Sequence, residues 1–505
     1  MFPSDTEFDT KVTLETEASP VDKDTPFHIL LMGNWSGRDS HSVSNGLRLI
    51  EIDRDNFEVV MKKLRVEVDL NFSETGGNVI SLEFTELEDF HPDKIFQSLP
   101  LFTDLRDIRR KLSNEKTFNE AAAEVRSWLV NESDTNQTEV PATLSESNEQ
   151  STENILDQIL DKSSVSPSSV PNNVNASSEL SSLINKLVKP HLIQTDQDEQ
   201  SKLLLIVDEV ISDLMRKILH HPRFQSLEAA WRGIFLLVRK LETDSSLRIF
   251  LLDVTKSAIA DNLKSVNDLS DSNIYRALNE SSEPWAIICG NYTFELNIED
   301  AAVLIRLAKI GSHFDAPFIS HIQPEMFGFS SFNSILPSDN WNISENSVQN
   351  KLWNTLRSVP EAEYLGLSVP RFLARLPYGE RTEPTETFYF EEFMQTVPHQ
   401  NYLWANPGFI CALLLAQSFQ ETGWALSRNL IQDIDNLPTH IYQKDGETKT
   451  KPCAEIAMTQ NNCERLIAQG LMPLISFRDT NRVRVGRFQS IGFSESMLKG
   501  KWNNG

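Results

Sequence analysis

The pattern of apolar and polar positions predicts short strands and helices along the first quarter of the chain. Residues 27–32 are almost continuously apolar, which predicts a buried strand, and Asn34–Gly37 predict the turn that ends it. An apolar stripe after Asp53 predicts a helix, and the alternation of apolar and polar residues over 79–87 predicts a half-exposed strand. A second helix is predicted over 91–96, because a proline lies where its first turn would be. Together these elements predict an α/β unit.

Helices and strands alternate in the second half of the chain. Two consecutive helices are predicted first, over 203–220 and 223–242, separated by Pro222, which cannot continue a helix. Later apolar runs predict buried strands over 247–254, 284–290 and 316–322, with a helix over 299–314 between the last two. This alternation favours a mostly parallel sheet covered by helices on both faces.

A polar stretch separates the two halves. From residue 131 to about 180, Ser, Asn, Glu, Asp, Thr and Pro dominate, aromatic residues are absent and Lys162 is the only basic residue. Such a composition buries too little apolar surface to offset the entropy lost on ordering. We therefore predict a disordered N-terminus (1–24), an α/β domain (25–130), a disordered acidic linker (131–200) and a larger α/β region (201–505).

One short helix is predicted inside the linker, over residues 153–161. Its apolar side chains recur at helical spacing on one side, at Ile155, Leu156, Ile159 and Leu160. A single amphipathic turn in a tether is either a docking peptide or a chance local helix. The pattern alone favours neither.

Charge and composition narrow the class of protein. The 505 residues carry 72 acidic and 47 basic side chains, a net charge of −25, which opposes binding to phosphate backbones and anionic membranes. Residues 1–25 lack the basic start and apolar run of a secretory signal, and the apolar run at 409–416 is too short to cross a bilayer. The four cysteines have no metal-type spacing. We expect a cytoplasmic protein that binds no nucleic acid and does not insert into a membrane.

Three motifs that could carry chemistry are incomplete. Gly33 and Gly37 are not followed by the lysine of a phosphate-binding loop, so this turn is interpreted as the corner where a strand leaves a sheet. His220 and His221 would point about 100° apart on a helix, which favours a helix end over a metal site. His313 and His321, eight residues apart, are more typical of a core than of a catalytic base.

A turn rich in arginine offers a further candidate. Arg371, Arg375 and Arg381 surround an aromatic turn and could hold the carboxylates of a substrate or of a partner. No nucleophile or catalytic dyad accompanies them in the sequence. A structural turn or an interface is therefore favoured, and we predict a protein that is not an enzyme and needs no metal or cofactor.

The first unit resembles the small sheath subunit of bacterial type VI secretion systems (TssB, also called VipA). The segments "FHILLMGNWSGR", "IEIDRDNFEVVMKKL" and "LEFTELEDFHPDKIF" occur in the order typical of that family, within residues 20–130. The signature positions of this unit, for which we expect a structural role, are Ser36, Gly37, Arg38, Asp53, Asp55, Asn56, Phe57, His91 and Pro92.

The second unit resembles the large sheath subunit of the same systems (TssC, VipB). The blocks "ILHHPRFQSLEAAWRGIFLLV", "SHFDAPFISHIQPEMFGFSSF", "YLGLSVPRFLARLPYG" and "YLWANPGFICALLLAQSF" follow in that family's order. The signature positions, again expected to be structural, are His221, Pro222, Trp231, Arg232, Gly233, Pro370, Arg371, Arg375, Pro377, Tyr378 and Gly379.

The resemblance implies a component of a contractile sheath, a helical polymer that surrounds the secreted needle tube and needs no active site. It also implies three kinds of partner, which are other sheath subunits or copies of this chain, needle-tube proteins and baseplate proteins. The 153–161 segment resembles the peptide of the large subunit that the AAA+ unfoldase ClpV grips. The residues carried over by position are Ile155, Leu156, Asp157, Ile159 and Leu160.

Two features depart from the family pattern. Both subunit types are joined in one chain, which fixes their ratio and raises the local concentration of each half near the other. The sequence ends shortly after "GRFQSIGFSESMLKG", where the large subunit normally continues for about one further domain. The alternative expectation is therefore a truncated, non-polymerising adaptor or regulator of the same apparatus.

Overall fold

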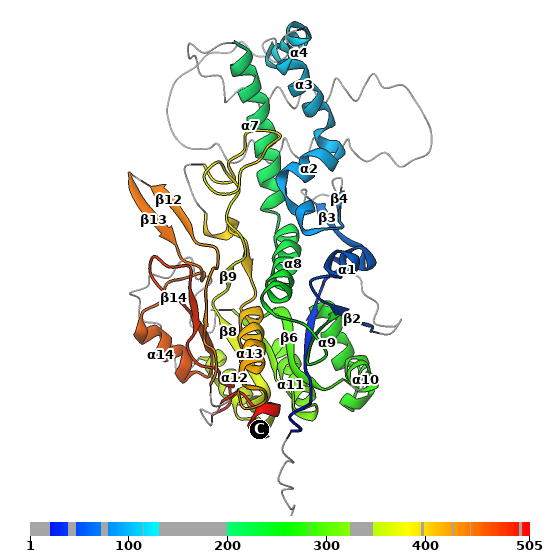
Figure 1. The fold of residues 1–505 in the computed structure, drawn as a ribbon, viewed down its shortest axis with the longest axis vertical. Helices are drawn as coiled ribbons and strands as arrows, with labels where there is room; N and C mark the ends of the chain where they lie inside the picture. The colour runs from blue at the N-terminus through cyan, green and yellow to red at the C-terminus, as the bar shows by residue number, and fades with distance from the viewer. Residues whose placement is uncertain are drawn as a thin grey trace, which may run out of the picture.

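The structure is a computed structural model that describes residues 21–38, 47–71, 79–114, 116–130, 199–281, 283–323, 347–394, 398–426, 429–444, 446–493 and 497–504. The described residues form an elongated molecule, with a large sheet in the lower half of Figure 1 and helices α3, α4 and α7 at its upper end. These helices span Thr103–Ser113, Phe118–Val130 and Glu199–Leu219. The predicted helix over 153–161 lies outside the described residues.

A nine-stranded sheet forms the centre of the molecule, in the order β11-β15-β14-β8-β7-β6-β1-β5-β2. All neighbours from β14 to β5 pair in parallel, whereas β2, β15 and β11 join the two ends by antiparallel pairing. This confirms the predicted mostly parallel sheet. The strands are β1 (Phe27–Gly33), β2 (Leu49–Ile52), β5 (Leu247–Asp253), β6 (Trp285–Phe294), β7 (Phe318–Ile322), β8 (Leu365–Val369), β11 (Asp433–Ile434), β14 (Met472–Ser476) and β15 (Val483–Val485).

Strand β1 comes from the first quarter of the chain but lies inside this sheet, between β5 and β6. Its seven residues pair with β5 from Phe27 opposite Leu247 to Gly33 opposite Asp253. All of them are buried. The dark-blue strand surrounded by green elements in Figure 1 is β1. The residues before and after the predicted linker therefore share one sheet.

Helices cover both faces of the sheet, as predicted. Because side chains alternate along a strand, Ile29 and Leu31 of β1 enter one hydrophobic cluster and Leu30 and Met32 enter another. The first cluster includes residues of α8 (Pro222–Lys240) and α13 (Gly408–Thr422). The second includes residues of α9 (Lys256–Lys264), α10 (Asn273–Glu280), α11 (Ile298–His313) and α12 (Val348–Arg357).

The remaining elements are shorter. The predicted helix after Asp53 is α1, the predicted half-exposed strand is β4, whose residues alternate between exposed and buried, and the predicted helix over 91–96 is α2. Their bounds, with those of the other elements, are α1 (Phe57–Leu64), β3 (Val66–Asn71), β4 (Val79–Phe84), α2 (Pro92–Ser98), β9 (Phe372–Leu373), β10 (Trp404–Ala405), β12 (His440–Lys444), β13 (Glu447–Lys451) and α14 (Gln460–Ala468). Short 3₁₀ helices span Leu87–Phe90, Pro100–Phe102, Leu269–Asp271, Pro360–Tyr364, His399–Asn401 and Lys501–Asn504.

Candidate functional site: the inter-segment interface

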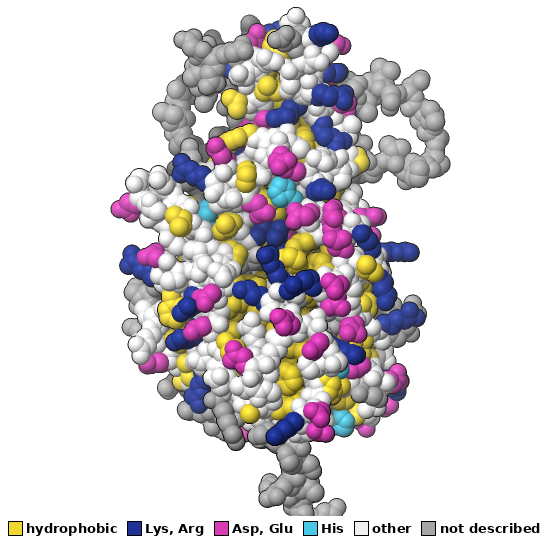
Figure 2. All heavy atoms as spheres, in the orientation of Figure 1, with side chains coloured by type: hydrophobic (Ala, Val, Ile, Leu, Met, Phe, Trp, Pro, Cys, Tyr) yellow, Lys and Arg dark blue, Asp and Glu magenta, His cyan; other side chains and the backbone are white. Residues whose placement is uncertain are grey.

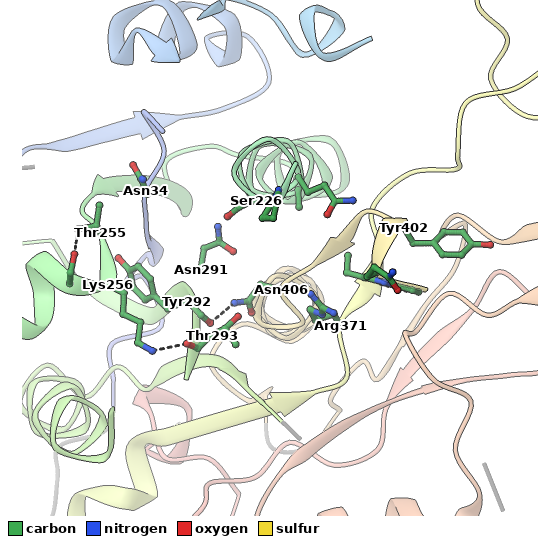
Figure 3. Close-up of a pocket in the computed structure, with 16 residues that line it drawn as sticks. Asn34, Ser226, Thr255, Lys256, Asn291, Tyr292, Thr293, Arg371, Tyr402 and Asn406 are labelled. Carbon is green, nitrogen blue, oxygen red and sulfur yellow. Dashed lines mark hydrogen bonds between the residues drawn. The ribbon is translucent and has the colours of Figure 1, made fainter. Parts of the chain in front are cut away.

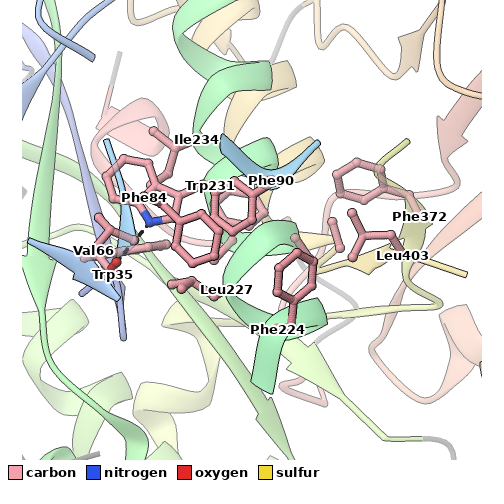
Figure 4. Packing of buried hydrophobic residues seen from close by; sticks show 14 of the residues in the cluster. Trp35, Val66, Phe84, Phe90, Phe224, Leu227, Trp231, Ile234, Phe372 and Leu403 are labelled. Carbon is pink, nitrogen blue, oxygen red and sulfur yellow. Dashed lines mark hydrogen bonds between the residues drawn. The ribbon is translucent and has the colours of Figure 1, made fainter. Parts of the chain in front are cut away.

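The N-terminal segment (described residues within 21–130) and the C-terminal segment (described residues within 199–504) meet along an extended contact, here called the inter-segment interface. Figure 4 shows its aromatic part, where Trp35, Phe84 and Phe90 pack near Phe224 and Trp231 of α8. The rings of Trp35 and Trp231 are fully buried, and Trp231 Nε1 donates to the Trp35 carbonyl at 2.9 Å. The two buried tryptophans thus join the apolar surfaces of the two segments.

The Ser36–Gly37–Arg38 turn directs the chain away from the end of β1. The Ser36 amide donates to Asp253 Oδ1 at 3.1 Å, which ties the turn to the end of β5. Gly37 has a φ of +80°, and a Cβ there would lie 2.0 Å from the Glu67 carbonyl oxygen, so both conformation and space favour glycine. Arg38 pairs with the Glu67 carboxylate at 2.5 Å. The turn is therefore a corner at which the chain leaves the end of β1, and Arg38 ties this corner to Glu67 of β3.

The signature residues around Asp53 form a turn that begins α1. The Asp53 carboxylate accepts from the amides of Asp55 and Asn56 at 2.9 and 2.8 Å, and Asn56 Oδ1 accepts from the Asp53 amide at 3.0 Å. This turn places Phe57 edge-on against Trp231, with ring centroids 5.4 Å apart. Phe57 thus contributes to the inter-segment interface through the orientation that the turn imposes.

Two His-Pro pairs begin helices in the same way. His91 Nδ1 accepts from the Asp93 amide and His221 Nδ1 from the Arg223 amide, each at 3.2 Å, while Pro92 and Pro222 occupy the first helical turn. His221 therefore caps α8, the helix that follows it. The interpretation of His220 and His221 as the end of the preceding helix missed this cap, because a histidine side chain is an uncommon N-cap.

Helix α2 is held against the loop between Tyr378 and Glu392. The His91 ring lies edge-on to the Tyr378 ring, with centroids 4.9 Å apart. The Asp93 carboxylate accepts from the amides of Glu386 and Thr387 at 2.9 and 3.0 Å. Since His91 and Tyr378 belong to the signatures of the two different units, this contact brings those signatures together.

A buried ion network lies where this loop meets α8, and it comprises Glu228, Arg232, Arg375 and Glu392. Arg375 is 5% exposed, and its guanidinium binds one carboxylate on each side, Glu228 Oε1 and Glu392 Oε2, both at 2.7 Å. Arg232 donates to the same Glu228 oxygen at 2.8 Å. Two basic and two acidic side chains thus balance one another, and Arg232 is the one member of the network that is partly exposed.

Burial and neighbouring charges shift the pKa values of this network in opposite directions. Burial would raise the pKa of Glu392, but the charges and hydrogen bonds of Arg375 and His220 together lower it to about 2. Burial would lower the pKa of Arg375, but the carboxylates of Glu228 and Glu392 together hold it well above its ordinary value. Tyr378 closes the network by accepting from Arg232 at 3.1 Å and placing its ring 4.1 Å from the Arg375 guanidinium. Glu392 and the two arginines therefore stay charged at neutral pH.

The other signature residues of the C-terminal segment have packing or pairing roles. Gly233 faces the Phe409 ring, where a Cβ would lie 2.4 Å from a ring carbon. Pro370 follows a cis peptide bond, and Arg371 forms a two-point pair with Glu455 at 2.5 and 2.9 Å. In the same loop, the Pro377 carbonyl accepts from Thr382 Oγ1 at 2.5 Å, and the Gly379 amide donates to the Glu383 carbonyl at 3.0 Å. Arg371 and Arg375 thus hold carboxylates of their own chain.

The remaining candidates do not come together. His313 is exposed and shares a hydrogen bond with the Tyr275 hydroxyl at 2.7 Å, whereas His321 is buried in β7 beside Thr293. Arg381 is exposed. Within the described ranges, no group of three His, Cys, Asp or Glu side chains has the arrangement of a metal site, and no helix is long and apolar enough to span a bilayer. Buried thiols occupy the positions of Cys289, Cys411, Cys453 and Cys463.

We predict that buried histidines make the fold sensitive to mild acid. Burial and the charge of Arg371 lower the pKa of His321 to about 3, and burial lowers the pKa of His440 to about 4. Between these values and the ordinary 6.5 of histidine, the unfolded chain binds protons that the folded chain does not, so stability falls as the pH drops. Each such histidine contributes a slope of up to about 1.4 kcal/mol per pH unit.

Urea denaturation at several pH values between 7.5 and 4.5 measures this slope. We expect His321→Gln to flatten it, and the exposed His313→Gln to leave it unchanged. A free energy of unfolding that stays constant from pH 6.5 to 4.5 would contradict the prediction.

Sequence reasoning missed the acidic side chains that hold the signature residues and the turns near them, which are Glu228, Asp253, Glu392 and Glu455, together with Asp93. One signal was present, because Glu228 lies four residues before Arg232 inside an otherwise apolar helical stretch. The other acidic side chains come from distant parts of the chain. Their pairing has no local signature.

Comparisons with known proteins agree with both resemblances. The tail sheath N-terminal domain family (VipB, EvpB) matches residues 201–491, and the type VI secretion system VipA family matches residues 9–137. The type VI secretion system sheath protein TssC1 of Pseudomonas aeruginosa is 32% identical over 291 residues. The aligned part is 55% of this chain and 58% of TssC1, so the chain spans little more than half the length of that relative.

The two matches follow the order of the two segments that share the nine-stranded sheet. The tail sheath model covers more than half of the residues. The chain therefore belongs to the tail sheath (VipB) family of type VI secretion systems, with a VipA-type segment joined ahead of its VipB-type domain.

Proposed function

We propose that this protein is a structural component of a contractile sheath, in which one chain supplies both the small-subunit and the large-subunit parts. The observation that carries the proposal is the position of β1, because a strand of the VipA-type segment lies between two strands of the VipB-type segment. Such an arrangement joins the two parts into a single building block. The block would assemble in the cytoplasm with other sheath subunits or with copies of itself.

The chemistry of the inter-segment interface supports a mechanical role. Its polar groups are paired across the two segments, as Arg109 is with Asp208 and as Asp93 is with the amides of Glu386 and Thr387, and its aromatic rings are closely packed. A subunit that transmits force between neighbours needs parts that do not separate, and buried pairs and packed aromatic rings resist separation. We further propose needle-tube and baseplate proteins as partners of the assembled form.

The outer surface also suits contacts between subunits. Figure 2 shows acidic and basic side chains interspersed with apolar ones over the face in view, with Lys and Arg gathered near its middle. Apolar side chains exposed over more than half of their surface include Val59, Ile298, Val348, Met394 and Ile441. Mixed charges allow complementary pairing between copies without a single strongly repulsive face.

Electron microscopy of the purified full chain, alone and mixed with a needle-tube protein, tests the proposal. We expect helical tubes or ordered rings, and light scattering should show a mass that is a large multiple of the monomer. Particles that remain monomeric in every mixture would contradict it and favour a non-polymerising adaptor.

We also propose that residues 153–161, which lie outside the described part of the chain, form a docking segment for an AAA+ unfoldase of the ClpV type. Ile155, Leu156, Ile159 and Leu160 would present the apolar face, with Asp157 beside it. Leu156→Asp should abolish capture of the full chain by immobilised unfoldase, whereas Ser163→Asp, just beyond the segment, should not. Equal capture of both variants would remove the proposal.

A further inference from the structure

A further opening lies beside the contacts discussed so far. It is a crevice of about 670 Å³ at the carboxyl ends of β1, β5 and β6, closed on one side by the first turn of α8. Figure 3 shows Asn34, Asn291 and Ser226 around it, from the N-terminal segment, β6 and α8 respectively. Its volume lies within the range of about 300–1,000 Å³ that small-molecule sites occupy.

The crevice lies at a topological switch point of the sheet. Strands β5 and β6 follow one another among the sheet strands along the chain, but they lie on opposite sides of β1. The connection from β5 therefore passes across β1, and the connections from the ends of β1 and β6 diverge. In open α/β sheets, ligands bind at this point, outside the carboxyl ends of the strands.

The charged side chains at the crevice are already paired. Lys256 Nζ lies 2.6 Å from Asp300 Oδ2 and donates to the Thr293 carbonyl at 2.8 Å. Arg371 is held by Glu455. Among the described residues that line the crevice, neither Asp nor Glu occurs. The site therefore presents little unbalanced charge to a ligand.

Neutral polar groups remain available. Asn34 Oδ1 is buried and has no hydrogen-bond partner in the described part of the chain. Asn291 adds a second carboxamide from the neighbouring strand, and the hydroxyls of Ser226 and Thr293 also face the crevice. Carboxamides and hydroxyls both donate and accept hydrogen bonds.

We propose that this crevice binds a small neutral polyhydroxylated ligand of monosaccharide to disaccharide size. Vicinal hydroxyls offer adjacent donors and acceptors, which match the carboxamides of Asn34 and Asn291. A neutral ligand also leaves the Lys256–Asp300 and Arg371–Glu455 pairs in place. Because Asn34 comes from the N-terminal segment and the other groups from the C-terminal segment, the bound ligand bridges both. The proposal does not rest on sheath assembly.

Saturation-transfer NMR on the full chain tests the site, with glucose, galactose, N-acetylglucosamine and maltose as probes. We expect a saturable signal for at least one sugar. Ser226→Trp, on the exposed start of α8, fills the crevice and should weaken binding about tenfold or more, a change of about 1.4 kcal/mol. The matched control Ser113→Trp, at an exposed helix end that does not line the crevice, should bind as the wild type does.

A second variant separates hydrogen bonding from steric blocking. Asn291→Leu keeps the approximate volume and removes the carboxamide, so it should weaken binding several-fold while leaving the fold intact. The absence of a saturable signal for all four sugars would overturn the proposal, as would a signal that survives Ser226→Trp. If no sugar binds and Ser226→Trp prevents assembly of the chain, the crevice is a protein contact and the proposal is likewise wrong.

Discussion

Replacing Arg375 by methionine is expected to lower the free energy of unfolding by about 3–5 kcal/mol, because removing one member of a buried ion pair leaves its partners uncompensated. Arg375 is the only described side chain that contacts both Glu228 and Glu392, which are 0% and 2% exposed. Methionine fills much of the space but offers no donor. Urea denaturation at neutral pH measures the loss.

Two further variants make this test specific. The exposed Arg381, in the same loop, provides the matched control, and Arg381→Met should change the free energy by no more than about 0.5 kcal/mol. Adding Glu392→Gln to Arg375→Met leaves Glu228 paired with Arg232, so the double variant should recover about 1–2 kcal/mol. Equal losses for Arg375→Met and Arg381→Met would show that the network contributes nothing to stability.

Residues 199–505 produced without the rest of the chain are expected to aggregate, whereas co-production with residues 1–137 should yield a soluble complex. Without β1, strands β5 and β6 lose the strand that lies between them, which exposes two unpaired edges and two apolar faces. Leu31, in the middle of β1, is 0% exposed and pairs with both Leu251 and Cys289. Size-exclusion chromatography of the two co-produced pieces measures the outcome.

Substitutions in the shorter piece identify the contact responsible. Leu31→Asp would place a charge inside the sheet and should prevent formation of the complex. Val59→Asp changes a residue of α1 that is 64% exposed, and the complex should form as it does for the wild type. A soluble, cooperatively unfolding product from residues 199–505 alone would contradict the view that the two segments form one folding unit.

Secondary structure was largely predictable because its signals are local. The alternation of Ile80, Leu82 and Phe84 with polar residues correctly predicted β4, and the Pro92 position predicted α2. The arginine-rich turn was interpreted as a structural turn or an interface, and two of its arginines, Arg371 and Arg375, hold carboxylates of this chain. The cap formed by His221 was missed because the preference for Ser, Thr, Asp and Asn at that position is strong.

The sequence by itself determined strands such as β1, β5 and β7, helices such as α7, α8 and α11, the acidic character and, through its motifs, the resemblance to both sheath subunits. Only the tertiary structure decided that β1 lies between β5 and β6. Strands buried on both faces are uniformly apolar, so their sequences do not specify which strands they pair with. The tertiary structure also decided which acids Arg375 meets, because Glu228 lies 147 residues away along the chain. Pairing over such a separation depends on how packed elements bring side chains together, which no local pattern encodes.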